Sequence, residues 1–500
     1  MSRKPKPKNT LSAGQRAAIY EEEIKRRLSP ESQQNISEKA ETVDKEEALP
    51  EKKKEKPQSV TVKADFALEG LPHTRLNGMC GAPLSKDADI SHLYTGARVP
   101  LVNLAGEECV LDICRIFKNF DADERREENY SFREADRYVL SAVGAGAKII
   151  CPLGVGLAYE YGKNLCLPEY YDKIATVCVN IIKHYNDYWC GGFALDLRMF
   201  DILPECEKYI TENNIPREDV FELYSRLSSA VKLYDESLSV GGMNFSECGH
   251  LMRDFVKFCQ KKNSPVDFVS LSLFGSGVED ICGQIERCLK LLKNSSYADA
   301  KIMVSKWSYL PLADSRKAHA LANSKRAEDA EKRKELFEKR KSVYGASFAS
   351  SMLLAMQSAD EVIGACMYGS VSDGMWCNIC DAYGLPEKVY YSLEAYSRYV
   401  NAKKSVFCRV EEKEGYTHSG VYAGASSNGD EAYVLISAYD GVQSIDLRLE
   451  NIPDKFYNAD IYMLDGVKNM DSPYTLELSG MKKRMVLNTS PYSVVFIKLY

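Results

Sequence analysis

A lysine, a tryptophan and a tyrosine stand at the polar end of an apolar run that contains β-branched residues. The run covers residues 302–304, and Lys306, Trp307 and Tyr309 follow it. A short run of this kind is typical of a buried parallel strand, and barrel enzymes carry their active sites at the C-terminal ends of such strands. We therefore expect these three side chains to line a site. A carboxylate at position 306 would indicate catalysis, whereas a lysine argues against it.

The elements that would position these residues alternate regularly along the chain. Apolar strands are predicted at residues 75–79, 100–104, 148–153, 197–203, 238–243, 268–274, 301–307 and 362–368. Helical patterns separate most of them, at residues 132–143, 168–184, 217–234, 249–262, 278–292, 348–358 and 387–400. Eight strands that alternate with helices predict an α/β fold, a (β/α)8 TIM barrel over residues 60–404.

Two flanking regions have a different character. From residue 405 to residue 500 the helical period gives way to short alternating runs with turn residues between them, which predicts a small antiparallel β-sandwich domain. Residues 60–65 also alternate, and we expect this strand to pair with an edge of that domain. Residues 1–59 are rich in Lys, Glu, Pro, Gln and Ser, which predicts a disordered charged tail.

One charged segment interrupts the barrel pattern. Residues 313–342 are rich in Lys, Arg, Glu and Ala and lie between the seventh strand and its helix. Because this connection leaves the C-terminal end of a strand, we expect it to project over the site face. It is either a solvated helical hairpin or a lid that binds a protein partner.

Composition excludes several classes of function. The net charge of −6 and the apolar fraction of 45% do not indicate a nucleic-acid or membrane partner. There is no transmembrane run and no secretory signal, so we expect a cytoplasmic protein with buried, reduced cysteines. One C-x-x-C pair, Cys377 and Cys380, lacks the second pair that a structural zinc site needs. We expect no cofactor and no metal ion, with metal or redox chemistry at this pair as the alternative.

The motif I-I-K-H-Y-N at residues 181–186, followed by Phe193, a strand that ends at Glu205 and the run 301–311, resembles glycoside hydrolase family 39. This is the β-xylosidase and α-iduronidase group, and the resemblance extends over residues 60–500. It implies a (β/α)8 barrel, a β-sandwich and a retaining mechanism. The family's acid/base is the Glu of W-E-x-W-N-E-P. Glu205 stands at that position here, preceded by Pro204 in place of Asn and without either tryptophan.

The second catalytic position departs from the family. Its nucleophile is the Glu of a T-E-W-N-Y-like run at the end of the seventh strand, and here Lys306 stands in that place. The resemblance implies sugar contacts for residues at the barrel mouth, namely Trp307, Tyr309, Trp376 and Phe274. Other orienting positions are replaced as well, with Asn103 at the second strand and Ser272 at the sixth.

Retaining hydrolysis needs two carboxyl groups about 5–5.5 Å apart. An ammonium cannot stabilise a positively charged transition state, and it would lower the pKa of Glu205, with which we expect it to form an ion pair. The sequence therefore indicates a catalytically degenerate glycosidase homologue that retains carbohydrate binding or serves as a scaffold through its tail or residues 313–342. One alternative is an active O-glycosyl hydrolase that pairs Asp201 with Glu205 in an inverting scheme. The other is a purely structural protein with a filled pocket.

Overall fold

The computed structural model describes residues 59–86, 88–105, 111–154, 165–204, 206–211, 214–310, 315–322, 324–369, 376–412, 418–439, 442, 444–478 and 484–500. The predicted tail lies outside these residues, apart from Ser59, so its disorder stays a prediction.

Eight parallel strands close into a barrel, which confirms the predicted fold class. Each strand pairs with the next, and the first pairs with the last, so that the sheet has no open edge. The strands are β2 (Gly78–Cys80), β3 (Leu101–Asn103), β4 (Lys148–Leu153), β5 (Met199–Ile202), β6 (Ser239–Phe245), β7 (Phe268–Gly275), β8 (Lys301–Tyr309) and β9 (Val362–Tyr368).

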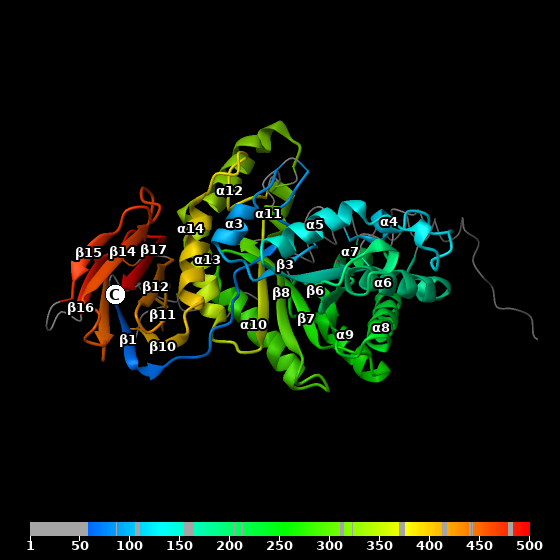
Figure 1. Ribbon diagram of the computed structural model, residues 1–500, viewed down its shortest axis with the longest axis horizontal. Coiled ribbons are helices and arrows are strands. Elements are labelled where there is room, and N and C mark those ends of the chain that lie inside the picture. Colours follow the sequence, from blue (N-terminus) through cyan, green and yellow to red (C-terminus); the bar gives the residue numbers. More distant parts are fainter. Residues whose placement is uncertain are drawn as a thin grey trace, which may run out of the picture. The chain divides into compact units, whose positions relative to one another are not determined.

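Helices follow most strands and cover the outside of the barrel (Figure 1). Helix α8 begins at the predicted residue 217, directly after Pro216, and carries Glu218 and Asp219 in its first turn. None of the described helices is long and apolar enough to cross a membrane. The helices are α3 (Ser91–Gly96), α4 (Ile113–Ile116), α5 (Arg133–Gly144), α6 (Tyr171–Asn186), α7 (Cys206–Thr211), α8 (Arg217–Tyr234), α9 (His250–Lys262), α10 (Val278–Lys293), α11 (Ser315–Ala322), α12 (Ala330–Lys341), α13 (Val343–Met356) and α14 (Lys388–Val400).

Alternate residues of the barrel strands face two different cores. A small cluster fills the barrel interior, and Phe268 and Met303 belong to it. A larger cluster lies between the strands and the helices and includes Val269, Ile302 and Val304. Most residues on both faces of these strands are therefore buried, which explains why the strands read as continuous apolar runs.

The C-terminal domain is one nine-stranded, mostly antiparallel sheet. Its core contains apolar residues from central strands and from strands near both ends of the sheet. Because distant strands contribute to one core, the sheet curves around it. In sheet order the strands are β15 (Tyr474–Glu477), β14 (Asn458–Leu464), β17 (Ser493–Leu499), β12 (Ala432–Ala438), β11 (Val421–Ser427), β10 (Lys404–Glu411), β1 (Ser59–Glu69), β13 (Ser444–Glu450) and β16 (Arg484–Asn488).

Strand β1 lies inside this sheet and not at its edge, where the sequence had placed it. It pairs antiparallel with β10 and parallel with β13. Its alternating burial fits a strand with neighbours on both sides and one face toward the core. The barrel helices α13 and α14 contact the other face of the sheet, where Ser351 donates a 2.9 Å hydrogen bond to Ser437.

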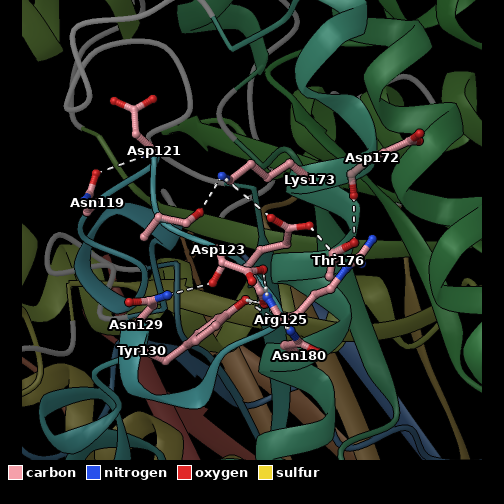
Figure 2. Close-up of polar contacts among 12 residues, drawn as sticks. Asn119, Asp121, Asp123, Arg125, Asn129, Tyr130, Asp172, Lys173, Thr176 and Asn180 are labelled. Atoms are coloured by element: carbon pink, nitrogen blue, oxygen red, sulfur yellow. Dashed lines mark hydrogen bonds and ion pairs between the residues drawn. The ribbon is translucent and has the colours of Figure 1, made fainter.

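The segment between β3 and α5 folds onto α6 through polar contacts (Figure 2). Lys173 donates a 2.5 Å hydrogen bond to the Ala122 carbonyl and lies 3.7 Å from the Glu124 carboxylate. Asn180 donates to the Glu124 carbonyl and to the Tyr130 hydroxyl, at 2.9 and 3.1 Å. Side chains of α6 therefore hold the segment between β3 and α5 in place.

The I-I-K-H-Y-N motif lies at the end of α6 and has a packing role. His184 is 1% exposed, and its ring stacks on Phe132 with centroids 3.6 Å apart. Its Nε2 lies 2.9 Å from an Asp136 oxygen, and its Nδ1 lies 2.9 Å from the Trp189 carbonyl. Both ring nitrogens are thus committed to structural contacts.

Candidate functional site

A bulge in β8 decides which of its side chains face the barrel interior. Ser270 of β7 pairs with Met303, but Ser272 pairs with Lys306, so β8 has one more residue than β7 between these points. An extra residue reverses the alternation of all side chains beyond it. As a result Ser305 and Lys306 both face inward, and Trp307 faces outward.

Lys306 lies at the C-terminal end of the barrel and is 8% exposed. Its ammonium is 5.9 Å from the centre of the ring of Tyr368, which is the last residue of the neighbouring strand β9. This distance is within the range of a cation–π contact. The residue that the sequence places at the nucleophile position is therefore among the side chains of the barrel mouth.

Trp307 and Tyr309 point away from the mouth, toward helix α13. Trp307 is fully buried, and its ring lies 6.3 Å from that of Phe348. Tyr309 lies 5.3 Å from the same ring, and burial raises the pKa of its hydroxyl. This placement disagrees with the expectation that the two rings line the site. They fill the space between the strands and α13.

Phe274 and Trp376 do lie at the mouth, in a row of aromatic rings. The Tyr368 ring stands between them, 5.7 Å from Phe274 and 6.1 Å from Trp376. Leu310 and Leu336 pack against the same cluster. Two of the four predicted sugar contacts thus converge with Lys306.

A fully buried arginine from α12 completes the cluster. The Arg340 guanidinium lies 4.7 Å from the Trp376 ring and donates a 2.8 Å hydrogen bond to the Trp376 carbonyl. It also donates to Ser308 Oγ at 2.7 Å, to the Tyr309 carbonyl at 3.2 Å and to the Tyr368 carbonyl at 3.4 Å. The charged insertion, residues 313–342, is therefore anchored in the barrel mouth.

Sequence reasoning missed Arg340 because nothing in the run E-K-R-K-E-L-F-E-K-R-K distinguishes one basic residue from another. The surface of α12 is otherwise as charged as predicted, with an exposed pair between Lys339 and Glu335 at 3.0 Å. The one available signal is spacing: Arg340 follows Leu336 by four residues, and these two are the buried residues of the helix.

Asp201 lies deeper in the barrel and is fully buried. It accepts hydrogen bonds from the Ser270 hydroxyl at 2.7 Å and from the Ser305 hydroxyl at 3.1 Å. Asn103 donates to the Ser305 carbonyl at 2.9 Å. These polar side chains link β3, β5, β7 and β8 across the interior.

Glu205, the predicted acid/base, lies outside the described residues, so its distance to Lys306 stays a prediction. Among the described residues, no group of three or more His, Cys, Asp or Glu side chains could hold a metal ion. The described mouth thus offers two cationic side chains and three aromatic rings.

The comparisons with known proteins agree with this architecture. Residues 181–286 match the sequence profile of Glycosyl hydrolases family 39. A β-xylosidase of Geobacillus stearothermophilus is 24% identical over 212 residues, which are 40% of this chain and 41% of that relative. These matches make part of the barrel similar to glycoside hydrolase family 39. Less than half the length of this curated relative is therefore matched.

Solved structures extend the similarity from this part of the chain to most of its fold. A glucosidase from Croceicoccus marinus superposes with a TM-score of 0.68 at 16% identity, over 89% of this chain and 99% of that one. A monomeric β-xylosidase from Caulobacter crescentus CB15 gives a TM-score of 0.64 at 13% identity, over 89% and 99%. At these identities the likeness establishes the fold and not the reaction.

Proposed function

We propose that this chain is a member of glycoside hydrolase family 39 that does not hydrolyse glycosides by the retaining mechanism, and that its barrel mouth binds a carbohydrate or serves as a scaffold. The observation that carries the proposal is the position of Lys306. Its ammonium lies at the barrel mouth beside Tyr368, at the end of the strand where the family's nucleophile is expected. A lysine there has no oxygen with which to attack an anomeric carbon and adds positive charge where the transition state is positive.

The environment of Asp201 supports this proposal against the enzyme alternative. Its carboxylate is fully buried and accepts hydrogen bonds from two hydroxyl groups, those of Ser270 and Ser305. A general base of an inverting glycosidase needs a water molecule between it and the sugar, with about 6.5–9.5 Å between the two carboxyl groups. A carboxylate that is enclosed by barrel strands suits a structural role better.

Carbohydrate binding is favoured by the exposed edge of the aromatic row. Phe274 is partly exposed and lies next to Tyr368, and an aromatic face is the usual platform for a pyranose ring. Trp376, 7% exposed, is largely covered by Phe337 and Arg340. The insertion therefore narrows the mouth, which favours a small saccharide over a long chain.

A scaffolding role would use the outer surface of the insertion. Helix α12 carries lysine, arginine and glutamate side chains along its exposed faces, while Leu336 and Arg340 fix it to the barrel. A helix that is anchored at one end and charged elsewhere can present these charges to a protein partner.

The decisive experiment is an assay on a panel of aryl glycosides, with xylosides and glucosides first because of the relatives' named activities. We expect no turnover above the uncatalysed rate. In parallel, the fluorescence of Trp376 should change when a xyloside or glucoside binds at millimolar concentration. Trp376→Phe should abolish that change, and Trp307→Phe, on the far side of the strand, should retain it.

Either result can contradict the proposal. Turnover that survives Lys306→Ala and is lost in Glu205→Gln would show that a second carboxylate operates. Absence of a fluorescence response across the panel would remove carbohydrate binding and leave the scaffolding role.

A further inference from the structure

The loop that follows β9 carries the C-x-x-C pair with its two sulfur atoms in contact. Cys377 Sγ and Cys380 Sγ lie 3.5 Å apart. Cys377 is 2% exposed and Cys380 is fully buried. Both cysteines are free thiols, so this pair is present in its reduced form.

The contact makes Cys377 the more acidic of the two. A hydrogen bond from the Cys380 thiol lowers the pKa of Cys377 to about 7, against burial, which raises it. Backbone hydrogen bonds at Cys380 and Ile379, and then the Lys341 ammonium, contribute smaller parts of this lowering. The same hydrogen bond raises the pKa of Cys380. A lowered pKa increases the thiolate fraction of Cys377 at neutral pH, and the thiolate is the reactive form.

The residues that flank this dithiol hold the anchor of the insertion. The Trp376 carbonyl accepts the 2.8 Å hydrogen bond from Arg340 Nη1. The Asn378 N–H donates to the Gly369 carbonyl at 2.8 Å, and its side-chain amide lies 3.5 Å from Ser308 Oγ, which also accepts from Arg340. The geometry of this short loop therefore sets the positions of two Arg340 acceptors.

We propose that Cys377 and Cys380 form a redox-active dithiol that a peroxide converts into an intramolecular disulfide, and that the disulfide loosens the attachment of α12 to the barrel mouth. This inference does not depend on whether the barrel hydrolyses glycosides.

The reaction balances in two steps. The Cys377 thiolate attacks one oxygen of hydrogen peroxide, the O–O bond breaks, and the departing hydroxide takes a proton to become water, leaving a sulfenic acid. The Cys380 sulfur then attacks the Cys377 sulfur, the S–O bond breaks, and the Cys380 proton leaves with the hydroxyl group as a second water. Two thiols are oxidised and one peroxide is reduced. Cys377 as a whole residue is 2% exposed, and we propose that hydrogen peroxide, a small oxidant, reaches its sulfur through local opening of the loop.

Bond formation acts on Arg340 through the loop. The two sulfurs must approach each other from their 3.5 Å contact, and this changes the torsions of Cys377, which is bonded directly to Trp376 and Asn378. The Trp376 carbonyl and the Asn378 amide then shift relative to the guanidinium. Loss of one hydrogen bond to a charged group should speed amide exchange in α12 about tenfold.

The test treats the full-length reduced protein with millimolar hydrogen peroxide and then with N-ethylmaleimide. Peptide mass spectrometry should find Cys377 and Cys380 unalkylated and joined, with the peptide lighter by two hydrogens. Amide exchange of α12 should rise in the oxidised protein and return to its first value after dithiothreitol. Recovery of both cysteines as maleimide adducts would overturn the proposal.

Variants separate this pair from other thiols. Cys248 is a matched control because a hydrogen bond from Cys288 lowers its pKa to about 7 as well. Cys248→Ser should leave the Cys377–Cys380 disulfide unchanged. The double variant Cys377→Ser/Cys380→Ser should show no peroxide-dependent exchange in α12. A disulfide that forms in the wild type without any change in α12 would overturn the link to Arg340.

Discussion

Replacing Arg340 by alanine should detach α12 from the barrel mouth. The side chain is fully buried and donates to three backbone carbonyls and to Ser308 Oγ. Alanine would leave these acceptors without the guanidinium and would uncover the Trp376 ring. The effect should be local, because the contacts join the insertion to the barrel and lie outside the barrel's apolar cores.

The magnitude follows from the contacts. The two shortest hydrogen bonds, 2.7 and 2.8 Å, contribute about 1.5 kcal/mol each, as is usual for a charged donor. The cation–π contact with Trp376 at 4.7 Å adds about 1 kcal/mol. Part of this loss is offset, because the variant no longer has to bury a charged guanidinium and because water can enter and bind the freed acceptors. We expect a net loss of about 3 kcal/mol.

Amide hydrogen exchange of α12 measures this loss directly. Local opening that is easier by about 3 kcal/mol should speed exchange in the helix about 100-fold, because 1.4 kcal/mol corresponds to a factor of ten. Arg340→Lys keeps the charge, but one ammonium cannot reach all four acceptors, so an increase of about tenfold is expected. Exchange in the C-terminal sheet should not change in either variant.

Lys334→Ala is the matched control on the same helix. Lys334 is 66% exposed and lies 3.8 Å from Glu338, so its loss should alter exchange by no more than about twofold. If Arg340→Ala behaves like Lys334→Ala, the guanidinium is not the anchor of the insertion.

Three further predictions concern charge and the tail. Lys306→Ala should lower the free energy of unfolding by about 3 kcal/mol if Glu205 is its ion-pair partner. The double variant Lys306→Ala/Glu205→Gln should then lose less stability than the two single variants lose together. Equal losses, measured by urea denaturation, would refute the ion pair. A hydrogen bond from His418, and to a smaller extent one from Tyr422, lowers the pKa of Glu279 to about 2. The stability it contributes is thus complete above about pH 4.5 and is lost as the pH falls toward 2. Because Glu279 is 56% exposed, we expect its contribution to the free energy of unfolding to be about 1 kcal/mol. This pH-dependent contribution should be absent when Glu279→Gln is unfolded across the same pH range. A chain that starts at residue 58 should melt at the temperature of the full chain, and a drop of several degrees would show that the tail packs on the body.

The order and type of the barrel elements could be predicted from the sequence because each has a strong local signal. Parallel strands buried on both faces read as apolar runs, and the helices between them show amphipathic periods with acidic first turns. The position of β1 within the C-terminal sheet could not be predicted this way. Its alternation marks a strand with one buried face, but its partners β10 and β13 are fixed by long-range pairing, which leaves no local pattern.

The site was harder to predict because one backbone irregularity controls it. A regular strand with Met303 inward would turn Ser305 and Trp307 inward and Lys306 outward. The bulge before Lys306 reverses this, so that Lys306 joins the mouth and Trp307 packs against Phe348. No residue type in the run V-S-K-W-S-Y marks the bulge. Phe274 and Trp376 were placed at the mouth through the family resemblance, and the apolar pattern alone would not have distinguished them from core residues.

The charge at position 306 decides the chemistry more strongly than any other feature of the mouth. A glutamate about 5 Å from an oxocarbenium-like carbon would stabilise it by about 3 kcal/mol at an effective dielectric constant of 20, and a lysine at that distance would destabilise it by a similar amount. The swing of about 6 kcal/mol corresponds to about 10⁴-fold in rate, before the loss of the covalent intermediate is counted. Arg340, fixed beside Trp376, brings a second positive charge to the same end of the barrel. Lys306→Glu would therefore correct only one of several changes. With Ser272 and Asn103 still in place of the family's orienting groups, we expect that variant to gain little activity.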